Sequence, residues 1–170
     1  MAKNKSADDL NDVIDDFDPQ TATNKQKGNF GEIKSADNLS NNSSLKEKGY
    51  DLKRIGDQAP KTLDDKIKKG IDGIYENSTS PPKYVIDEAK YNSSKLNQKT
   101  KSGPQMSDDW IEKRIKKDQS LTKEQKDDII KALHNKQVDR IVSQVDETGK
   151  VTTYKVDVNP DGKTSYGKTK

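Results

Sequence analysis

Apolar residues are sparse in this chain and gather in short segments whose spacing predicts both strands and helices. Segments 71–75 and 84–91 are rich in β-branched and aromatic residues, and the polar stretch between them contains two prolines, which predicts two adjacent strands. Segment 49–55 alternates well enough for an earlier strand. Valine-rich segments 138–145 and 151–158, separated by a turn at 147–149, predict a C-terminal β-hairpin.

Three further segments show the signs of helices. Ser107 and Thr122 are good N-cap residues, and Thr122 opens a Thr-Lys-Glu-Gln capping box, so a helix is expected after each. Segment 38–48 is rich in Asn and Ser and predicts a loop, and the lysine-rich segment 58–69 predicts a connection or short helix. An earlier helix with one apolar side is predicted by Phe30, Ile33, Ala36 and Leu39. Together these elements predict an α/β fold.

Size and charge balance limit what the chain can be. It has 170 residues, is 27% hydrophobic, and carries 32 basic and 29 acidic residues for a net charge of +3. Low hydrophobicity with balanced charge predicts one small domain with a thin core and disordered ends. The expected division is a flexible appendage at 1–27, a domain at 28–160 and a flexible tail at 161–170. Within the appendage, a short amphipathic helix is predicted by Leu10, Val13, Ile14 and Phe17.

Several classes of site are excluded by residue counts. The chain has no cysteine, which excludes disulfides and thiolate zinc sites, and its one histidine, His134, excludes histidine-rich zinc sites. A surface position at a helix end is expected for His134. No stretch approaches the length of a membrane span, and the chain starts without the apolar region of a signal peptide. No feature predicts a homo-oligomer.

The strongest chemical candidate lies in the predicted strand pair. Side chains in a strand alternate between faces, so Glu88 and Lys90 project from the same face. If the strands pair so that Asp72 sits beside Glu88, two carboxylates meet on one divalent cation, with Lys90 placed to orient water or stabilise charge on a phosphate. Gly70 and Gly73 flank Asp72 and would allow close approach of backbone or substrate. The alternative is a solvated hairpin face with an ordinary mixture of charges.

These residues resemble a known family. The segments Gly-Ile-Asp-Gly-Ile-Tyr and Tyr-Val-Ile-Asp-Glu-Ala-Lys-Tyr, with Gly-Pro-Gln-Met-Ser-Asp-Asp-Trp-Ile further on, resemble the core of PD-(D/E)xK nucleases, and more narrowly the nuclease toxin domains of contact-dependent growth inhibition and other polymorphic bacterial toxins. The resemblance implies a small restriction-endonuclease-like core, in which a mixed central sheet is flanked by helices. It implies that Asp72 and Glu88 are metal ligands, Lys90 the catalytic lysine, and Glu32 the acid of the first core helix. Ile71 stands before Asp72, where the family name has proline.

The resemblance also implies a function and partners. The expected protein is a metal-dependent DNase toxin that uses Mg²⁺, or Mn²⁺ or Zn²⁺ in its place. It would be exported as part of a larger toxin, act in the cytoplasm of a target bacterium, and be neutralised by a cognate immunity protein. Two alternatives stay open: a tRNA-cleaving toxin of the same fold, and a non-enzymatic binding domain with a decorative charged hairpin.

A basic cluster on the predicted helix after Ser107 is the candidate nucleic-acid contact. It consists of Lys113, Arg114, Lys116 and Lys117. Cations beside an active cleft would hold a phosphate backbone, although a solvated helix surface has the same composition. Gln105 and Ser107, at the helix entrance, are further candidates for contacting substrate or metal-bound water.

Overall fold

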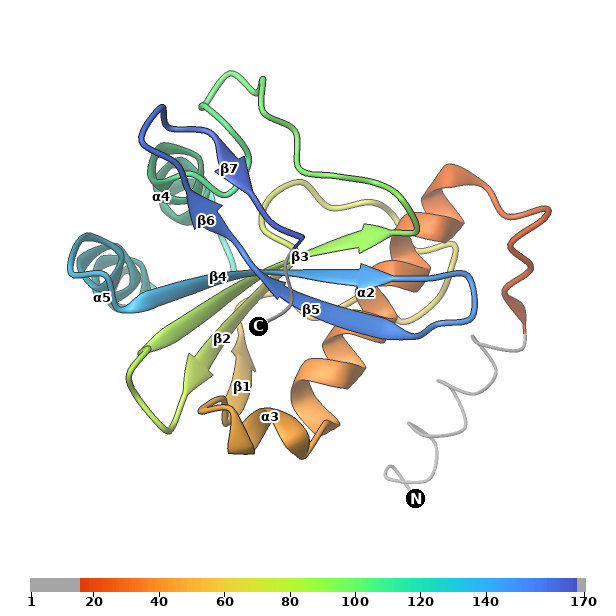
Figure 1. Ribbon diagram of the computed structural model, residues 1–170, viewed down its shortest axis with the longest axis horizontal. Coiled ribbons are helices and arrows are strands. Elements are labelled where there is room, and N and C mark those ends of the chain that lie inside the picture. The colour runs from red at the N-terminus through yellow and green to blue at the C-terminus, as the bar shows by residue number, and fades with distance from the viewer. Residues whose placement is uncertain (1–15, 168–170) are drawn as a thin grey trace.

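A five-stranded mixed sheet forms the centre of the protein in a computed structural model that describes residues 16–167 (Figure 1). The strands lie in chain order across the sheet, as β1 (Leu52–Ile55), β2 (Gly73–Asn77), β3 (Tyr84–Tyr91), β4 (Val138–Val145) and β5 (Val151–Lys155). All neighbours are antiparallel except β3 and β4, which are parallel. The predicted α/β class with a mixed sheet is confirmed.

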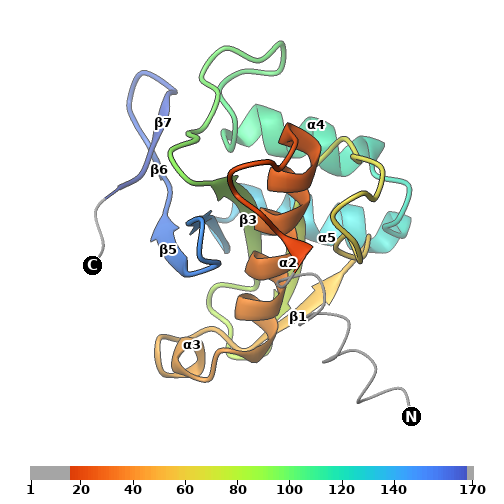
Figure 2. The ribbon, with the colours of Figure 1, turned by 90° about the vertical axis from the view of Figure 1, so that its right-hand side faces the viewer.

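Helices cover both faces of this sheet (Figure 2). Helix α2 (Asn24–Asn41) packs on one face, where Leu39 contacts the cluster around Val85. Helices α4 (Asp108–Lys117) and α5 (Lys123–His134) pack on the other face, against Ile86. Because side chains alternate along β3, each face receives every second residue of that strand.

The parallel pair explains the place of α4. A parallel connection needs a long crossover, and here it comprises segment 92–107, α4 and α5 between β3 and β4. Ser107 caps α4 with its hydroxyl, which accepts a hydrogen bond from Trp110 N at 3.4 Å. The capping box of Thr122 and Gln125 begins α5. Both predicted helix starts are confirmed.

The N-terminal helix is longer than the sequence pattern predicts. Helix α2 begins at Asn24, where Thr23 and Gln26 form a capping box, and it runs to Asn41. A short helix, α3 (Ser44–Glu47), follows. The loop predicted at 38–48 is therefore wrong, because burial of Leu39 and Leu45 outweighs the low helix propensity of the Asn and Ser residues around them.

The folded domain also extends further toward the N-terminus than residue 28. Phe17 is buried and stacks on Phe30 with 3.8 Å between ring centroids, and Tyr91 of β3 meets both rings edge-on. Residues 16–27 thus belong to the fold, and not to a loose appendage. The amphipathic helix predicted from Leu10 lies largely outside the described residues.

The C-terminal segment forms a second small sheet. The predicted hairpin of β4 and β5 is confirmed, but β5 ends at Lys155, and the next residue, Val156, is buried. The chain continues as β6 (Asp157–Val158), which pairs with β7 (Thr164–Ser165). The flexible tail predicted at 161–170 is therefore wrong as far as residue 167, since Thr164 is buried and bonded to Gln98.

Candidate active site

Asp72 and Glu88 lie side by side where β2 pairs with β3. The register places Gly73 opposite Asp87, so Asp72, one residue earlier, faces Glu88. Asp72 Oδ2 accepts a hydrogen bond from Ala89 N at 2.9 Å, and Asp72 N donates to Glu88 Oε1 at 3.4 Å. The predicted pairing of these two acids is confirmed.

Lys90 and Gln105 complete the surroundings of Glu88. Lys90 follows on the same face of β3, and its positive charge lowers the pKa of both Asp72 and Glu88, against the larger effect of burial. Gln105 Nε2 donates a hydrogen bond to Glu88 Oε2, and Gln105 Oε1 accepts one from Asn97 N at 2.9 Å. The Glu88 carboxylate is thus held by partners at both oxygens.

Two more carboxyl groups join this pair. Glu32 projects from α2, where burial and then the charge of Asp72 raise its pKa to about 8. Asp87 is 1% exposed and accepts a hydrogen bond from Ser143 Oγ at 2.7 Å. Burial raises the pKa of Asp87 to about 7, and Asp72 adds to that rise. Glu32 was predicted to belong to the site, whereas Asp87 was missed because strand alternation turns it to the face opposite Glu88.

These four acids form a cluster of largely enclosed carboxyl groups. Burial raises the pKa of Asp72 and raises that of Glu88 well above its ordinary value, and in Glu88 the neighbouring Asp72 adds to the effect. Carboxylates enclosed in this way cost free energy unless a cation or a proton balances them. A cluster of this kind is a common mark of a functional site.

Arg54 is a half-buried cation beside Asp72, and sequence reasoning missed it. Its Nη2 donates to Asp72 O at 2.6 Å, its Nη1 to Tyr75 Oη at 3.2 Å, and its Nε to Asp57 O at 2.7 Å. A Cβ at Gly73 would lie 3.2 Å from Arg54 Nη1 and 2.9 Å from Tyr75 Cε1, so glycine makes room for this contact. Only the register of β1 against β2, which pairs Arg54 with Tyr75, reveals its place.

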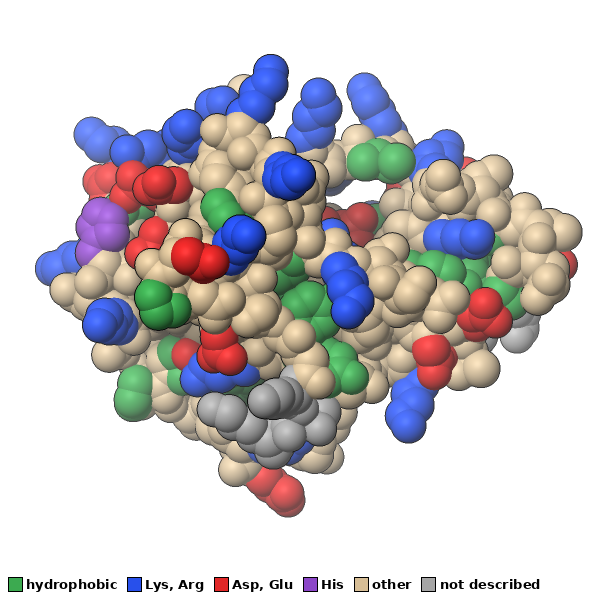
Figure 3. Space-filling model, turned by 45° about the horizontal axis from the view of Figure 1, so that its top comes forward, with side chains coloured by type: hydrophobic (Ala, Val, Ile, Leu, Met, Phe, Trp, Pro, Cys, Tyr) green, Lys and Arg blue, Asp and Glu red, His purple; other side chains and the backbone are tan. Residues whose placement is uncertain are grey.

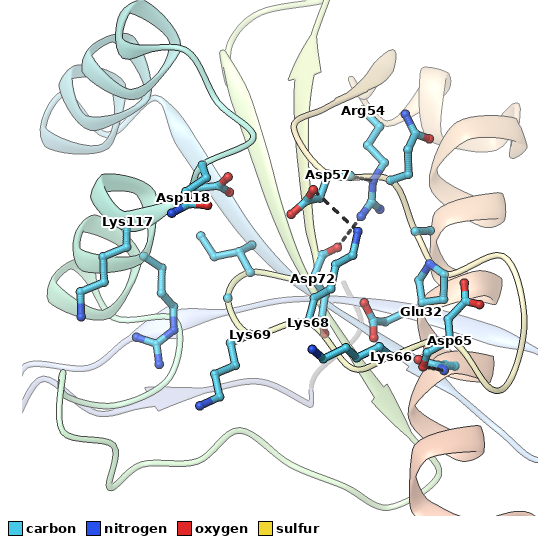
Figure 4. Close-up of a pocket in the computed structure, with 18 of the residues that line it drawn as sticks. Glu32, Arg54, Asp57, Asp65, Lys66, Lys68, Lys69, Asp72, Lys117 and Asp118 are labelled. Atoms are coloured by element: carbon cyan, nitrogen blue, oxygen red, sulfur yellow. Dashed lines mark hydrogen bonds and ion pairs between the residues drawn. The ribbon is translucent and has the colours of Figure 1, made fainter.

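A cavity of about 600 Å³ opens above Asp72 and Glu32. It lies between α2, segment 57–72 and α4, and Figure 4 shows Asp72 between Lys117 of α4 and Glu32 of α2. Lys and Arg side chains gather along the border of the molecule where its surface is hollowed (Figure 3). The basic residues that line the cavity are Arg54, Lys61, Lys66, Lys68, Lys69, Lys113, Arg114 and Lys117.

The predicted basic cluster is divided by the geometry of α4. Lys113, Arg114 and Lys117 line the cavity, and the guanidinium of Arg114 stacks on the Trp110 ring, 4.1 Å from its centroid. Lys116 does not line the cavity, because successive residues of a helix point in different directions and its side chain faces away from that of Lys117. The Lys116 ammonium pairs with Glu112 at 3.4 Å.

Ser107 and His134 have local roles at helix ends. Ser107 is 8% exposed and its hydroxyl caps α4, so it does not line the cavity. His134 ends α5 and its Nε2 lies 2.8 Å from Glu112 Oε1, at an exposed position outside the cavity. The expected helix-end place of His134 is confirmed.

The oxygen donors at the cavity suit a hard divalent cation. Within residues 16–167, no three His, Asp or Glu side chains are gathered closely enough to form a complete protein cage for an ion. Mg²⁺ does not need such a cage, because it commonly takes one or two carboxylates and keeps several waters. Asp72 and Glu88 provide such a pair, and burial raises the pKa of both carboxyl groups.

Comparison with family models, with curated proteins and with solved structures found no match for this chain. No helix in the described part of the chain has the length and apolar character needed to cross a membrane. The likeness to PD-(D/E)xK nuclease toxin domains accordingly rests on the motif residues themselves, and the family stays a prediction.

Proposed function

We propose that this protein is a metal-dependent nuclease that hydrolyses phosphodiester bonds in DNA. The observation that carries the proposal is the position of Asp72 beside Glu88, next to a cavity bordered by lysines and arginines. Hydrolysis of a phosphodiester requires negative oxygens to hold a cation and positive groups to hold the substrate, and both are present here.

The residues divide the chemistry between them. Asp72 and Glu88 would hold Mg²⁺, or Mn²⁺ or Zn²⁺ in its place, and the bound cation would polarise the phosphate and lower the pKa of a water. Lys90 orients the attacking water or stabilises charge on the phosphate, because its charge acts on both acids. Gln105 holds Glu88 in place through its hydrogen bond to Oε2.

Glu32 and the cations of the cavity serve the substrate side. Glu32 places a further carboxyl group close to Asp72 and completes the acidic cluster. Lys113, Arg114 and Lys117 contact phosphates next to the one that is cleaved. Because phosphate contacts carry no information about the sugar, tRNA is the second candidate substrate.

The toxin context follows from the resemblance alone. We keep as predictions a cognate immunity protein, export within a larger toxin, and action in the cytoplasm of a target bacterium. All three depend on the proposed cleavage of nucleic acid.

Incubation with supercoiled plasmid and with total tRNA, each with Mg²⁺ and with EDTA, tests the proposal. We expect cleavage that needs the metal and is lost in Asp72→Asn, while Asp109→Asn, an exposed position of α4, cuts like the unchanged protein. Circular dichroism and a melting curve establish that both variants are folded. Intact nucleic acid with Mg²⁺, Mn²⁺ and Zn²⁺ alike would favour the non-enzymatic binding domain instead.

A further inference from the structure

The acidic side chains of the proposed site are recessed below the protein surface. Glu88 is 5% exposed and Asp87 1% exposed, and neither lines the cavity, whereas Asp72 and Glu32 do. A phosphodiester group therefore reaches Asp72 and Glu32 by entering the cavity. The substrate must present its backbone to a hollow, and not to a flat or protruding surface.

Positive side chains stand on two opposing walls of this hollow. Lys113, Arg114 and Lys117 belong to α4, and Lys61, Lys66, Lys68 and Lys69 belong to segment 57–72. Figure 4 shows Lys117 across the cavity from Lys66 and Lys68. A strand that passes between the walls has cations on both of its sides. These cations can bind the phosphates next to the cleaved bond.

A double helix does not fit inside the cavity. Its volume is about 600 Å³, and pockets of roughly 300–1,000 Å³ are typical of sites for small molecules. A duplex is much larger, since the major groove of B-DNA alone is about 12 Å wide and accepts a whole α-helix. An unpaired strand has free backbone torsions and exposes its phosphates one by one, as loops, bulges and ends do.

The lining predicts little preference for particular bases. Among the described residues that line the cavity none is aromatic, so no aromatic ring offers a base a stacking platform. Ala59, Pro60 and Ile71 are the apolar residues of the lining. Contacts to the polymer are thus mainly charge contacts to phosphates, which are the same for every sequence.

We infer that the cavity selects an unpaired polynucleotide strand, which passes between α4 and segment 57–72 and lowers one phosphate toward Asp72. This inference rests on the proposed nuclease function and names its substrate class. Duplex regions are cut only where they open, and cleavage depends weakly on base sequence.

The test compares three substrates. They are a single-stranded oligodeoxynucleotide of mixed sequence, the same oligonucleotide annealed to its full complement, and a single-stranded RNA of the same sequence. Cleavage with Mg²⁺ is measured together with binding by fluorescence anisotropy in EDTA. We expect the unpaired strand to be cut faster and bound more tightly than the duplex. Equal or faster cleavage of the duplex overturns the inference. The RNA arm decides between DNA and RNA as the unpaired polymer.

The binding arm separates this inference from the proposed function. If no form is cut, the nuclease proposal fails, and the anisotropy data decide alone: tighter binding of the unpaired strand supports the cavity as its site, and equal binding overturns it. Two single variants, Lys66→Ala and Lys117→Ala, change one lysine on each wall. Each should lower affinity for the unpaired strand by about tenfold at low salt. Lys123→Ala, at the exposed start of α5, should not.

Discussion

Arg54 Nη2 donates a hydrogen bond to Asp72 O at 2.6 Å, so the backbone of Asp72 is fixed to the neighbouring strand β1. The guanidinium also lowers the pKa of Asp72 and of Glu32, against burial. Arg54 thus both positions the acidic cluster and offsets part of its charge.

Arg54→Ala should therefore shift the pH dependence of cleavage. Without the cation the pKa values of the nearby acids rise further, so the acids ionise, and cleavage appears, at higher pH. Arg54→Lys keeps the charge but not the three directed donors, and should recover the pH profile more than the rate. Lys53→Ala, exposed on the same strand, is the control. An unchanged pH profile in Arg54→Ala would show that Arg54 has only a structural role.

Stability of the metal-free protein should fall as pH rises. The pKa of Glu32 is raised from 4.5 to about 8, and that of Asp87 from 3.8 to about 7. Such groups hold more protons in the folded than in the unfolded state. Their contribution is therefore fully present below the ordinary pKa values and lost as pH rises through the raised ones. The melting temperature in EDTA should be lower at about pH 8 than at about pH 5.

Glu32→Gln tests the source of this pH dependence. The neutral amide removes one buried charge, so the variant should melt higher than the unchanged protein at about pH 8, by roughly 2–4 °C for each 1 kcal/mol regained. Glu124→Gln, exposed on α5, should leave the pH dependence as it is. Thermal melts across the pH range give the comparison, and parallel curves for Glu32→Gln and the unchanged protein would contradict it.

Gln105 should matter for rate and little for folding. Gln105→Ala removes the donor to Glu88 Oε2 and leaves the carboxylate free to turn, which should lower kcat by about tenfold or more. Gln20→Ala, exposed before α2, is the matched control. Steady-state cleavage kinetics with Mg²⁺ distinguish the two variants. Rates that match for Gln105→Ala and Gln20→Ala would remove Gln105 from the site.

Neighbouring lysines of α4 should behave differently. Lys117 lines the cavity, whereas Lys116 pairs with Glu112 and faces away. Lys117→Ala should reduce affinity for nucleic acid and the slope of affinity against salt, by about one unit of released counterion. Lys116→Ala should change both less. Anisotropy titrations at several salt concentrations measure this, and equal effects of the two substitutions would place the substrate elsewhere on α4.

The sequence was sufficient for parts of the site that depend on local spacing. Alternation along 84–91 placed Glu88 and Lys90 on one face, and the two strand segments predicted the neighbour Asp72. Helix starts at Ser107 and Thr122 followed from their caps. These features depend on neighbours within a few residues of the chain.

Features that depend on distant packing could not be predicted. The position of Arg54 follows from strand register. Asp87 acts on Glu32 because α2 packs against β3, which the spacing of the sequence does not show. Burial of Leu39 extends a helix through residues of low propensity. In each case a tertiary contact outweighs the local preference that a sequence displays.

The central claim is that the acids of β2 and β3 act together with Lys90 on a phosphodiester. Its most direct test is plasmid cleavage by the unchanged protein, Glu88→Gln and Lys90→Met, each folded by circular dichroism, with Mg²⁺ and with EDTA. We predict cleavage by the unchanged protein with Mg²⁺ alone, and a loss of at least about 100-fold in both variants. Cleavage that persists in EDTA, or a variant that cuts as fast as the unchanged protein, would contradict the claim.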